Sequence, residues 1–206
     1  MTSAIDSQFD IIVFDLGGVL IELTGVQRML EWLEDGTSAE QLWERWLASE
    51  SVRGFECGRL NADEFAEAFL AEFEIPVSAE QFLTEFTAWP KAPYDGAGDL
   101  LRQLAKSHTV ACLSNTNALH WSRIDREMEL LPHFTHHFAS HLVGMLKPDR
   151  EIFKHMVEQL GCPPERILFL DDNLLNVEGA RAVGIPAYQV QGLAGAIEKL
   201  AELGVR

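Results

Sequence analysis

The sequence predicts an α/β fold: a doubly wound parallel sheet with an all-helical insertion after the first strand. Short apolar runs at residues 10–15, 109–113 and 166–170 alternate with amphipathic stretches. Such runs are typical of strands buried on both faces of a parallel sheet, and their alternation with helices indicates doubly wound topology. Residues 22–94 contain no convincing strand, and their apolar residues recur at helical spacing. We therefore predict a core domain of residues 1–21 and 95–206 and a helical domain of residues 22–94.

The core elements follow in order along the chain. Residues 10–15 form the first expected strand, which ends in Asp15. The later expected strands are residues 109–113, 137–140, 166–170 and 186–190. The helices expected around them are residues 98–107, 150–160 and 176–183, the last of which is closed by Gly184. A chain of 206 residues is long enough for one such domain with a modest insertion.

We predict the insertion to be a small bundle of helices. Phe65, Phe69 and Phe73 are spaced by four residues and share one helical face. Asn61 and Ser78 stand where N-caps are expected, because each is followed three positions later by Glu or Gln. The helices are expected to be separated at Gly36, Gly54, Gly58 and Pro76, with Trp32, Trp43 and Trp46 in the core of the bundle.

The chain is strongly acidic. It has 32 Asp and Glu residues against 16 Lys and Arg, which gives a formal net charge of −16. A surface of this sign repels polyanions, so nucleic-acid binding is not expected. Residues 22–94 alone hold fifteen acidic residues against five basic ones, as solvated helix faces do. An anionic substrate would therefore have to be attracted locally, by a cation, a lysine or backbone N–H groups.

The composition indicates a cytoplasmic protein with no membrane partner. No apolar run approaches the roughly 20 residues that cross a bilayer. The polar residues 1–8 lack the pattern of a secretory signal. Cys57, Cys112 and Cys162 are odd in number and widely separated, which is typical of free thiols in a reducing compartment. The sequence carries no signature of an oligomeric state.

Four polar motifs adjoin the expected core elements. They are Asp15-Leu16-Gly17-Gly18, Ser114-Asn115 and Asp171-Asp172 directly after strands, and Lys147-Pro148 before a helix. Ligands bind at the carboxyl ends of the strands in an open parallel sheet, so we expect these motifs to meet. Each motif alone is typical of a turn or a helix cap. Their order at successive strand ends is what indicates a catalytic site.

The residue types suit transfer of a phosphoryl group. Asp15 can attack phosphorus and form an acyl-phosphate, and a hard divalent cation with oxygen ligands would offset the charge of that attack. Asp171 and Asp172 supply further carboxylates, which repel each other unless a cation lies nearby. The Gly17-Gly18 pair permits a sharp turn that brings a main-chain carbonyl toward the metal. The donors expected to hold the phosphate are Ser114, the N–H of Asn115 and Lys147.

In this order the motifs resemble those of the haloacid dehalogenase superfamily, over essentially the whole chain. The branch that the chain resembles contains α-D-glucose-1-phosphate phosphatase and the N-terminal phosphatase domain of soluble epoxide hydrolase. The resemblance implies that residues 22–94 are the family's helical cap. It also implies a magnesium-dependent phosphatase that acts on a small phosphate ester. A sugar phosphate is the substrate class that the resemblance favours, and the cap would select the substrate.

The resemblance also implies a role for each motif residue. Asp15 would be the nucleophile and a magnesium ligand. The main-chain oxygen of Gly17 and the carboxylate of Asp172 would be further ligands, and Asp171 would act through a bound water. The residues implied to hold and neutralise the transferring phosphoryl group are Ser114, Asn115 and Lys147.

One position departs from the family pattern. Most phosphatases of the superfamily carry a second aspartate two residues after the nucleophile, as general acid and base, and this chain has Gly17 there. General acid–base help is worth about 10²–10⁴-fold in rate, so its loss slows the reaction unless another group substitutes. Candidate substitutes in an expected cap loop are Glu50, Arg53 and Glu56, and His120 and Trp121 are candidates for lining the site.

Two other functions remain open. A 2-haloacid dehalogenase uses its aspartate to attack carbon without a metal, but that branch typically has a bulky aromatic residue in place of Gly17. The Asp171-Asp172 pair also favours a cation. A binding or regulatory module that kept the fold without turnover is the third hypothesis, and Gly17 motivates it.

A cluster of histidines offers one further hypothesis, a metal site. Its members are His133, His136, His137 and His141. An expected turn and strand run through the cluster, so the side chains should diverge, which disfavours this hypothesis.

Overall fold

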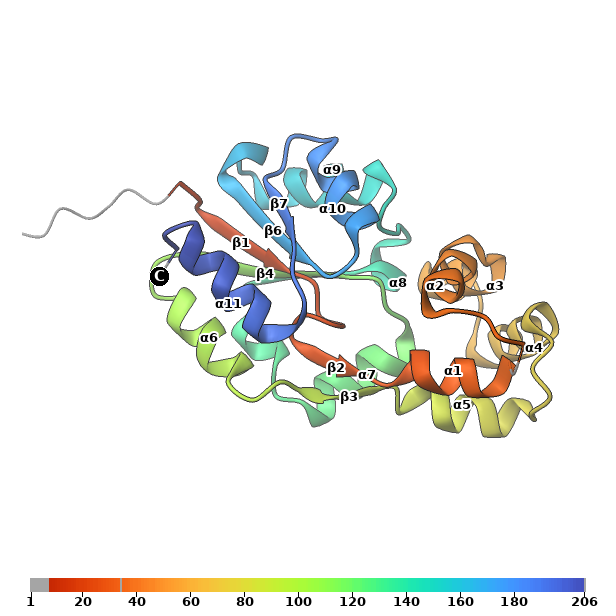
Figure 1. The fold of residues 1–206 in the computed structure, drawn as a ribbon. Helices are drawn as coiled ribbons and strands as arrows, with labels where there is room; N and C mark the ends of the chain where they lie inside the picture. The colour runs from red at the N-terminus through yellow and green to blue at the C-terminus, as the bar shows by residue number, and fades with distance from the viewer. Residues whose placement is uncertain (1–7, 34, 206) are drawn as a thin grey trace, which may run out of the picture.

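The computed structural model describes residues 8–33 and 35–205, and its centre is a five-stranded parallel sheet. The order is β5-β4-β1-β6-β7, formed by β1 (Ile11–Phe14), β4 (Thr109–Ser114), β5 (His136–Ala139), β6 (Ile167–Asp171) and β7 (Ala187–Gln189). The central strand β1 pairs with β4 on one side and with β6 on the other. The carboxyl ends of these three strands therefore lie side by side, at the topological switch point (Figure 1). The predicted doubly wound sheet is confirmed.

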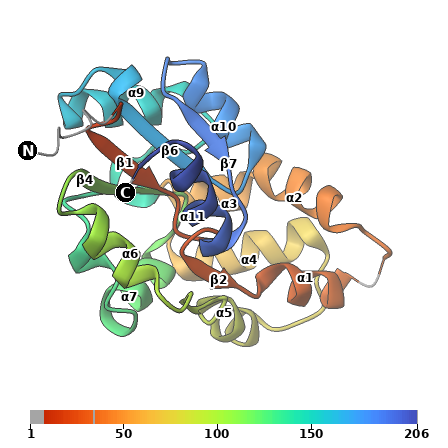
Figure 2. The ribbon, with the colours of Figure 1, turned by 60° about the vertical axis from the view of Figure 1, so that its left-hand side comes forward.

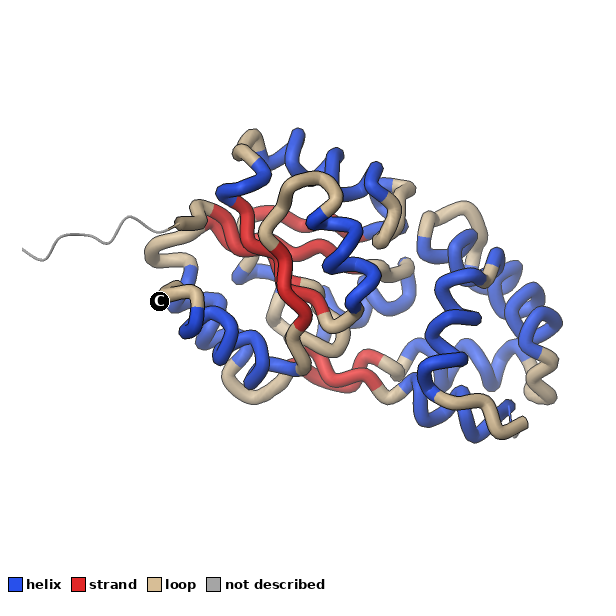
Figure 3. Tube along the Cα trace, turned by 45° about the horizontal axis from the view of Figure 1, so that its top comes forward, coloured by secondary structure: helices blue, strands red, loops and turns tan. Residues whose placement is uncertain are grey.

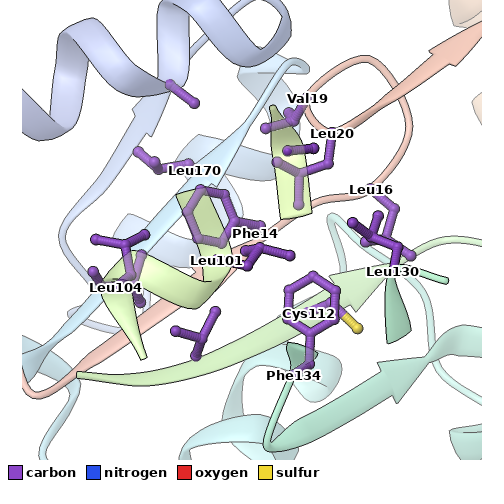
Figure 4. Packing of buried hydrophobic residues seen from close by; sticks show 14 of the residues in the cluster. Phe14, Leu16, Val19, Leu20, Leu101, Leu104, Cys112, Leu130, Phe134 and Leu170 are labelled. Carbon is purple, nitrogen blue, oxygen red and sulfur yellow. The ribbon is translucent and has the colours of Figure 1, made fainter. Parts of the chain in front are cut away.

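Helices cover both faces of the sheet (Figures 1 and 2). One face packs against α6 (Ala97–Leu104), α7 (Ala118–Glu127) and α11 (Gly192–Glu202), and the other against α9 (Arg150–Leu160) and α10 (Leu174–Arg181). Side chains of β1 alternate between the two cores, with Ile12 and Phe14 in one and Ile11 and Val13 in the other. Figure 4 shows the larger core, in which Phe14 lies close to Leu101 of α6. Burial on both faces explains why the strands are uniformly apolar.

The core is completed by short elements. They are α8 (Ser140–Val143) after β5 and two 3₁₀ turns, η1 (Leu131–His133) and η2 (Pro164–Arg166). Most bounds agree with the sequence prediction to within two residues. α10 begins at Leu174, two residues before the predicted start, because the Asn173 side chain accepts a hydrogen bond from the Leu175 N–H at 2.9 Å and caps the helix there.

Five helices form the cap, beyond the carboxyl ends of the strands (Figures 1 and 3). They are α1 (Gly25–Leu33), α2 (Ala39–Ala48), α3 (Glu50–Glu56), α4 (Ala62–Phe73) and α5 (Ala79–Thr87). Phe65, Phe69 and Phe73 lie together in one aromatic core, as predicted. Asn61 accepts from the Glu64 N–H at 3.0 Å, and the Glu64 carboxylate accepts from the Asn61 N–H at 2.9 Å, so the predicted capping box is present.

Two strands that the sequence does not predict join the cap to the core. β2 (Ile21–Leu23) pairs antiparallel with β3 (Pro90–Pro93). The expectation that residues 22–94 hold no strand is therefore wrong. A proline at each end of β3 removes two N–H donors, and this composition gives no strand signal in a sequence. The division of the chain at residues 21/22 and 94/95 stays a prediction, and the strand pair lies at these boundaries.

Two details of the predicted cap differ in the structure. Gly54 lies inside α3 and does not separate helices. A Cβ at Gly54 would lie 2.8 Å from Leu60 Cδ1, so the glycine makes room for that side chain. Trp32 is buried and Trp46 packs against the same core, but Trp43 is 38% exposed and lies on the surface of α2.

Candidate active site

Three carboxylates meet at the carboxyl ends of β1 and β6. Asp15 directly follows β1, Asp171 ends β6, and the two strands are paired neighbours. One oxygen each from Asp15, Asp171 and Asp172 lies within 4.8 Å of the other two. Across residues 8–33 and 35–205, this is the only group of three or more His, Cys, Asp or Glu side chains that could hold a metal ion. The four clustered histidines form no such group.

Lys147 is the cation that joins two of these carboxylates, Asp15 and Asp171. Its side chain is 1% exposed, and its Nζ lies 2.7 Å from Asp171 and 3.0 Å from Asp15. The same nitrogen donates to the carbonyl of Leu113 at 3.0 Å. Burial lowers the pKa of a lysine, but here the two carboxylates outweigh it, and the pKa of Lys147 lies above its ordinary value. Lys147 is therefore charged at neutral pH.

Asp171 is held by donors on all sides. Its carboxylate accepts from Lys147 Nζ, from the Asn173 N–H at 2.8 Å, and from Asn176 Nδ2 at 3.0 and 3.1 Å. The residue is completely buried. Because these donors occupy both oxygens, Asp171 orients Lys147 and has little capacity left for a further ligand. The sequence predicts no role for Asn176, and its place in the first turn of α10, five residues after Asp171, is the signal that could have found it.

Asp15 and Asp172 have raised pKa values. Burial raises the pKa of Asp15 to about 8; Lys147 opposes this shift, and Asp171 and Asp172 add to it. Burial and the charge of Asp171 raise the pKa of Asp172 to about 6. A hard divalent cation with oxygen ligands would offset this repulsion and keep both groups ionised. The donor set therefore fits Mg²⁺.

The Gly17-Gly18 turn brings the main chain close to Asp172. Gly18 has a φ of +70°, and a Cβ there would overlap the Asp172 carboxylate. The turn is fixed by main-chain hydrogen bonds from Gly18 N to Ile21 O at 2.9 Å and from Ile21 N to Leu16 O at 2.8 Å. These bonds leave the carbonyl of Gly17 outside the pairing. Glycine at position 18 is thus required both by the backbone and by the carboxylate beside it.

Replacing Gly18 by alanine is expected to displace Asp172 and weaken the cation site. Positive φ costs a non-glycine residue about 1–2 kcal/mol, and forcing a methyl group into filled space adds about 1–3 kcal/mol. Loss of a well-placed ligand should weaken Mg²⁺ binding by about 10–100-fold. Thermal unfolding with and without Mg²⁺ measures both effects.

Gly161→Ala is the matched control for this prediction. Gly161 also has a positive φ, of +59°, but a Cβ there would have no neighbour within 4 Å. The Gly161→Ala variant should lose only the stability that the positive φ costs an alanine, and it should keep the full stabilisation by Mg²⁺. An equal response of the two variants to Mg²⁺ would show that Gly18 serves the backbone alone.

Ser114 and Asn115 lie where β4 ends. Ser114 is buried, and its hydroxyl makes only a weak contact of 3.4 Å with the Asn115 carbonyl. The Asn115 side chain forms two hydrogen bonds of 2.9 Å with the main chain of Lys147, one from its Nδ2 to the carbonyl and one accepted from the N–H. Asn115 therefore fixes the main chain of Lys147, a contact for which the sequence carries no signal. Its own N–H remains the group predicted to face phosphate.

The cap approaches the same end of the sheet through α3. Arg53 donates to Asp149, two residues after Lys147, at 2.7 Å. Glu56 lies at the end of α3 and is partly exposed, but its surroundings desolvate the carboxyl enough to raise its pKa to about 7. A Trp46 hydrogen bond and the charges of Lys147 and Arg53 oppose that shift. These residues were expected in a loop and lie instead in a helix.

His120 and Trp121, the two residues suggested to line the site, have contacts of their own, and their place in the site stays a prediction. His120 stacks on Phe86, with ring centroids 4.3 Å apart, and its Nε2 is 2.7 Å from the Phe86 carbonyl. Burial lowers the pKa of His120 to about 4, so it is neutral and joins α7 to α5 of the cap. Trp121 packs against the larger core of the sheet.

Comparison with known proteins identifies the family. A family model described as haloacid dehalogenase-like hydrolase matches residues 9–184. The chain belongs to this family. This hydrolase is 31% identical over 183 residues to a sesquiterpene phosphatase of Aspergillus oryzae, covering 86% of the chain and 87% of the relative. It is 25% identical over 185 residues to a D-ribitol-5-phosphate phosphatase of Bacteroides thetaiotaomicron, covering 86% and 90%.

Solved structures agree with this assignment. A haloacid dehalogenase family enzyme of Bacteroides thetaiotaomicron, in complex with magnesium and inorganic phosphate, superposes with a TM-score of 0.72. It is 27% identical, and the match covers 89% of this chain and 94% of that one. The predicted family and fold are thus confirmed.

Two further matches bear on the predicted branch and on its alternative. Rat bifunctional epoxide hydrolase 2 is 36% identical over 72 residues, 35% of this chain and 13% of the relative. An (S)-2-haloacid dehalogenase of Pseudomonas fluorescens is 26% identical over 199 residues, which cover 91% of this chain and 87% of the relative. Separately, no described helix has the length and apolar character to span a membrane.

Proposed function

We propose that this haloacid dehalogenase-like hydrolase is a magnesium-dependent phosphomonoester hydrolase that works through an aspartyl-phosphate on Asp15. One observation carries the proposal: buried Lys147 lies 3.0 Å from Asp15 and 2.7 Å from Asp171, beside a third carboxylate. A fixed positive charge next to a strand-end aspartate is what attack on an anionic phosphoryl group requires. The phosphatase relatives support the same reaction class.

The proposed roles follow from the contacts. The Asp15 carboxylate attacks phosphorus, and the positive charge of Lys147 neutralises the phosphoryl group beside it. Ser114 Oγ and the N–H of Asn115 donate to the other phosphoryl oxygens. Asp15, Asp172 and the Gly17 carbonyl would hold Mg²⁺. Asp171, which was predicted to act through a bound water, has both oxygens filled by donors and would hold Lys147 in place instead. When bound, the ion would offset the negative charge shared by nucleophile and phosphate.

The proposed substrate is a small phosphate ester, with sugar phosphates as the first candidates. The names of the relatives include a phosphorylated sugar alcohol and a terpenoid, which supports a cap that chooses the substrate. We also propose a cytoplasmic location, which is supported by the free thiols of Cys57, Cys112 and Cys162.

Phosphate release tests the proposal. The purified protein is assayed with sugar phosphates, polyol phosphates and an isoprenoid phosphate, first with Mg²⁺ and then after removal of metal with EDTA. At least one ester should release phosphate, metal removal should reduce the rate to background, and added Mg²⁺ should restore it. No release from any ester by protein shown to bind Mg²⁺ would favour the non-catalytic module.

A dehalogenase is the second candidate, because a haloacid dehalogenase matches most of the chain. Attack on carbon needs no cation, whereas this site gathers three carboxylates and leaves two of them with raised pKa values. Halide release from 2-chloropropionate in the presence of EDTA would support the dehalogenase and count against the phosphatase.

A further inference from the structure

The turn after β1 provides no proton donor for a leaving group. Position 17 is glycine, and the space beside it is taken by Leu23, whose Cδ1 lies 2.8 Å from the position of a Cβ. Lys147 is bound to Asp15, Asp171 and the Leu113 carbonyl. The cap faces the carboxyl ends of the strands and can supply a donor there (Figure 1).

Helix α3 of the cap is fastened to the core at two points, one on each side of Glu56. Arg53, three residues before it, forms a salt bridge of 2.7 Å with Asp149. Gly58, two residues after it, lies so close to the core that a Cβ there would be 2.5 Å from the carbonyl oxygen of His141. Asp149 and His141 bracket the segment that carries Lys147. Glu56 is thus held over the same segment as the buried lysine.

The surroundings of Glu56 agree with this placement. The charge of Lys147 acts on its carboxyl group across the boundary between cap and core. The other groups that act on it are Arg53 of α3 and the indole of Trp46 in α2. A carboxyl group with a pKa of about 7 is present in both its acid and its basic form at neutral pH, which suits a group that must give and then take a proton.

We propose that Glu56 is the general acid and base of the reaction, in the role that Gly17 leaves open. The inference rests on the proposed function. In the first step the Asp15 oxygen bonds to phosphorus, the bond from phosphorus to the ester oxygen breaks, and Glu56 gives its proton to that oxygen. In the second step water attacks phosphorus and the bond to Asp15 breaks. Glu56 takes the proton of the water, so Asp15 and Glu56 return to their starting forms.

Glu56→Gln, assayed with two kinds of leaving group, tests the inference. An alkyl phosphate needs a proton on its leaving oxygen, whereas p-nitrophenyl phosphate has a leaving group that departs without one. For the alkyl phosphate, kcat/KM should fall by about 10²–10⁴-fold. For p-nitrophenyl phosphate, kcat/KM should change little. The second step still lacks its base, so this variant should release a burst of p-nitrophenol equal to the enzyme concentration and then turn over slowly.

The pH profile gives an independent reading. In the wild type, kcat/KM for the alkyl phosphate should fall as the pH rises through about 7, because Glu56 then loses the proton it must donate. This limb should be missing in Glu56→Gln. Glu44→Gln, at an exposed position of α2 in the same cap, should behave as wild type with both substrates.

The outcomes separate this inference from the proposed function. If the wild type is active and Glu56→Gln loses the same factor in kcat/KM for both substrates, with no burst, Glu56 is only structural and the inference is wrong. If the wild type releases phosphate neither from any ester of the panel named under the proposed function nor from p-nitrophenyl phosphate, the proposed function fails and the inference fails with it. A selective loss with the alkyl phosphate, a burst and an altered pH limb support it.

Discussion

Asp15→Asn is expected to lose phosphatase activity toward every substrate, by on the order of 10⁴-fold or more, as when a nucleophile is removed. An amide at this position cannot form the acyl-phosphate, and the neighbouring Asp171 cannot replace it because donors fill both of its oxygens. Phosphate release measures the loss. Mass spectrometry of the quenched enzyme should find a phosphorylated wild type and an unmodified variant.

The free energy of unfolding of Asp15→Asn should show that the variant loses activity because its chemistry is lost and not because it fails to fold. The pKa of Asp15 is raised from 3.8 to about 8, so without metal the folded state holds a proton that the unfolded state releases. This makes Asp15 cost stability increasingly as the pH rises from about 4 to about 8. Asp15→Asn removes that cost, so the metal-free variant should gain relative to the wild type across this range. Asp63→Asn, exposed on α4, should change neither property. Retained activity in Asp15→Asn would contradict the mechanism.

Lys147→Met is expected to lose both activity and stability. Removing one partner of a buried ion pair costs about 3–5 kcal/mol, because the remaining charge is left uncompensated. Asp171, which is completely buried, would lose its only cationic partner among the described residues. Chemical denaturation measures the loss, and Mg²⁺ should recover part of it by supplying positive charge near the same carboxylates.

Two comparisons sharpen the lysine prediction. Lys147→Arg should not restore activity, because the planar guanidinium of arginine does not fit the space that the compact ammonium group of lysine fills. Lys154→Met, exposed on α9, should stay within about 0.5 kcal/mol of the wild type. Wild-type stability in Lys147→Met would mean that the lysine is not the charge that balances Asp171.

The core and the gathering of the motifs could be predicted from the sequence, because both follow from local rules. A run such as residues 166–170 is apolar throughout since both faces are buried, and the carboxyl ends of neighbouring parallel strands must lie together. Asp15, Asp171 and Lys147 therefore meet as expected, although they are far apart in the chain. Their catalytic roles stay predictions, which the two experiments above test.

The contacts between distant segments could not be predicted. The Asn115 side chain forms hydrogen bonds with the main chain of Lys147, and Arg53 donates to Asp149. Both contacts exist only because folding brings distant segments within hydrogen-bond distance. Neither pair has a local pattern. The strand at Pro90–Pro93 was missed for a related reason: it is defined by its partner β2, while its own prolines argue against a strand.

The pairing of β2 with β3 has a mechanical consequence. Both ends of the cap pass through this one ribbon, so a rotation of the five helices about it would leave Asp15 and Lys147 with the sheet, but it would have to break the contact of His120 with Phe86. Lifting α3 would break the Arg53–Asp149 bridge and carry Glu56 outward with it. Entry of a substrate and delivery of a proton would then depend on the same movement, so that Glu56 would be in place only when the cap lies against the core.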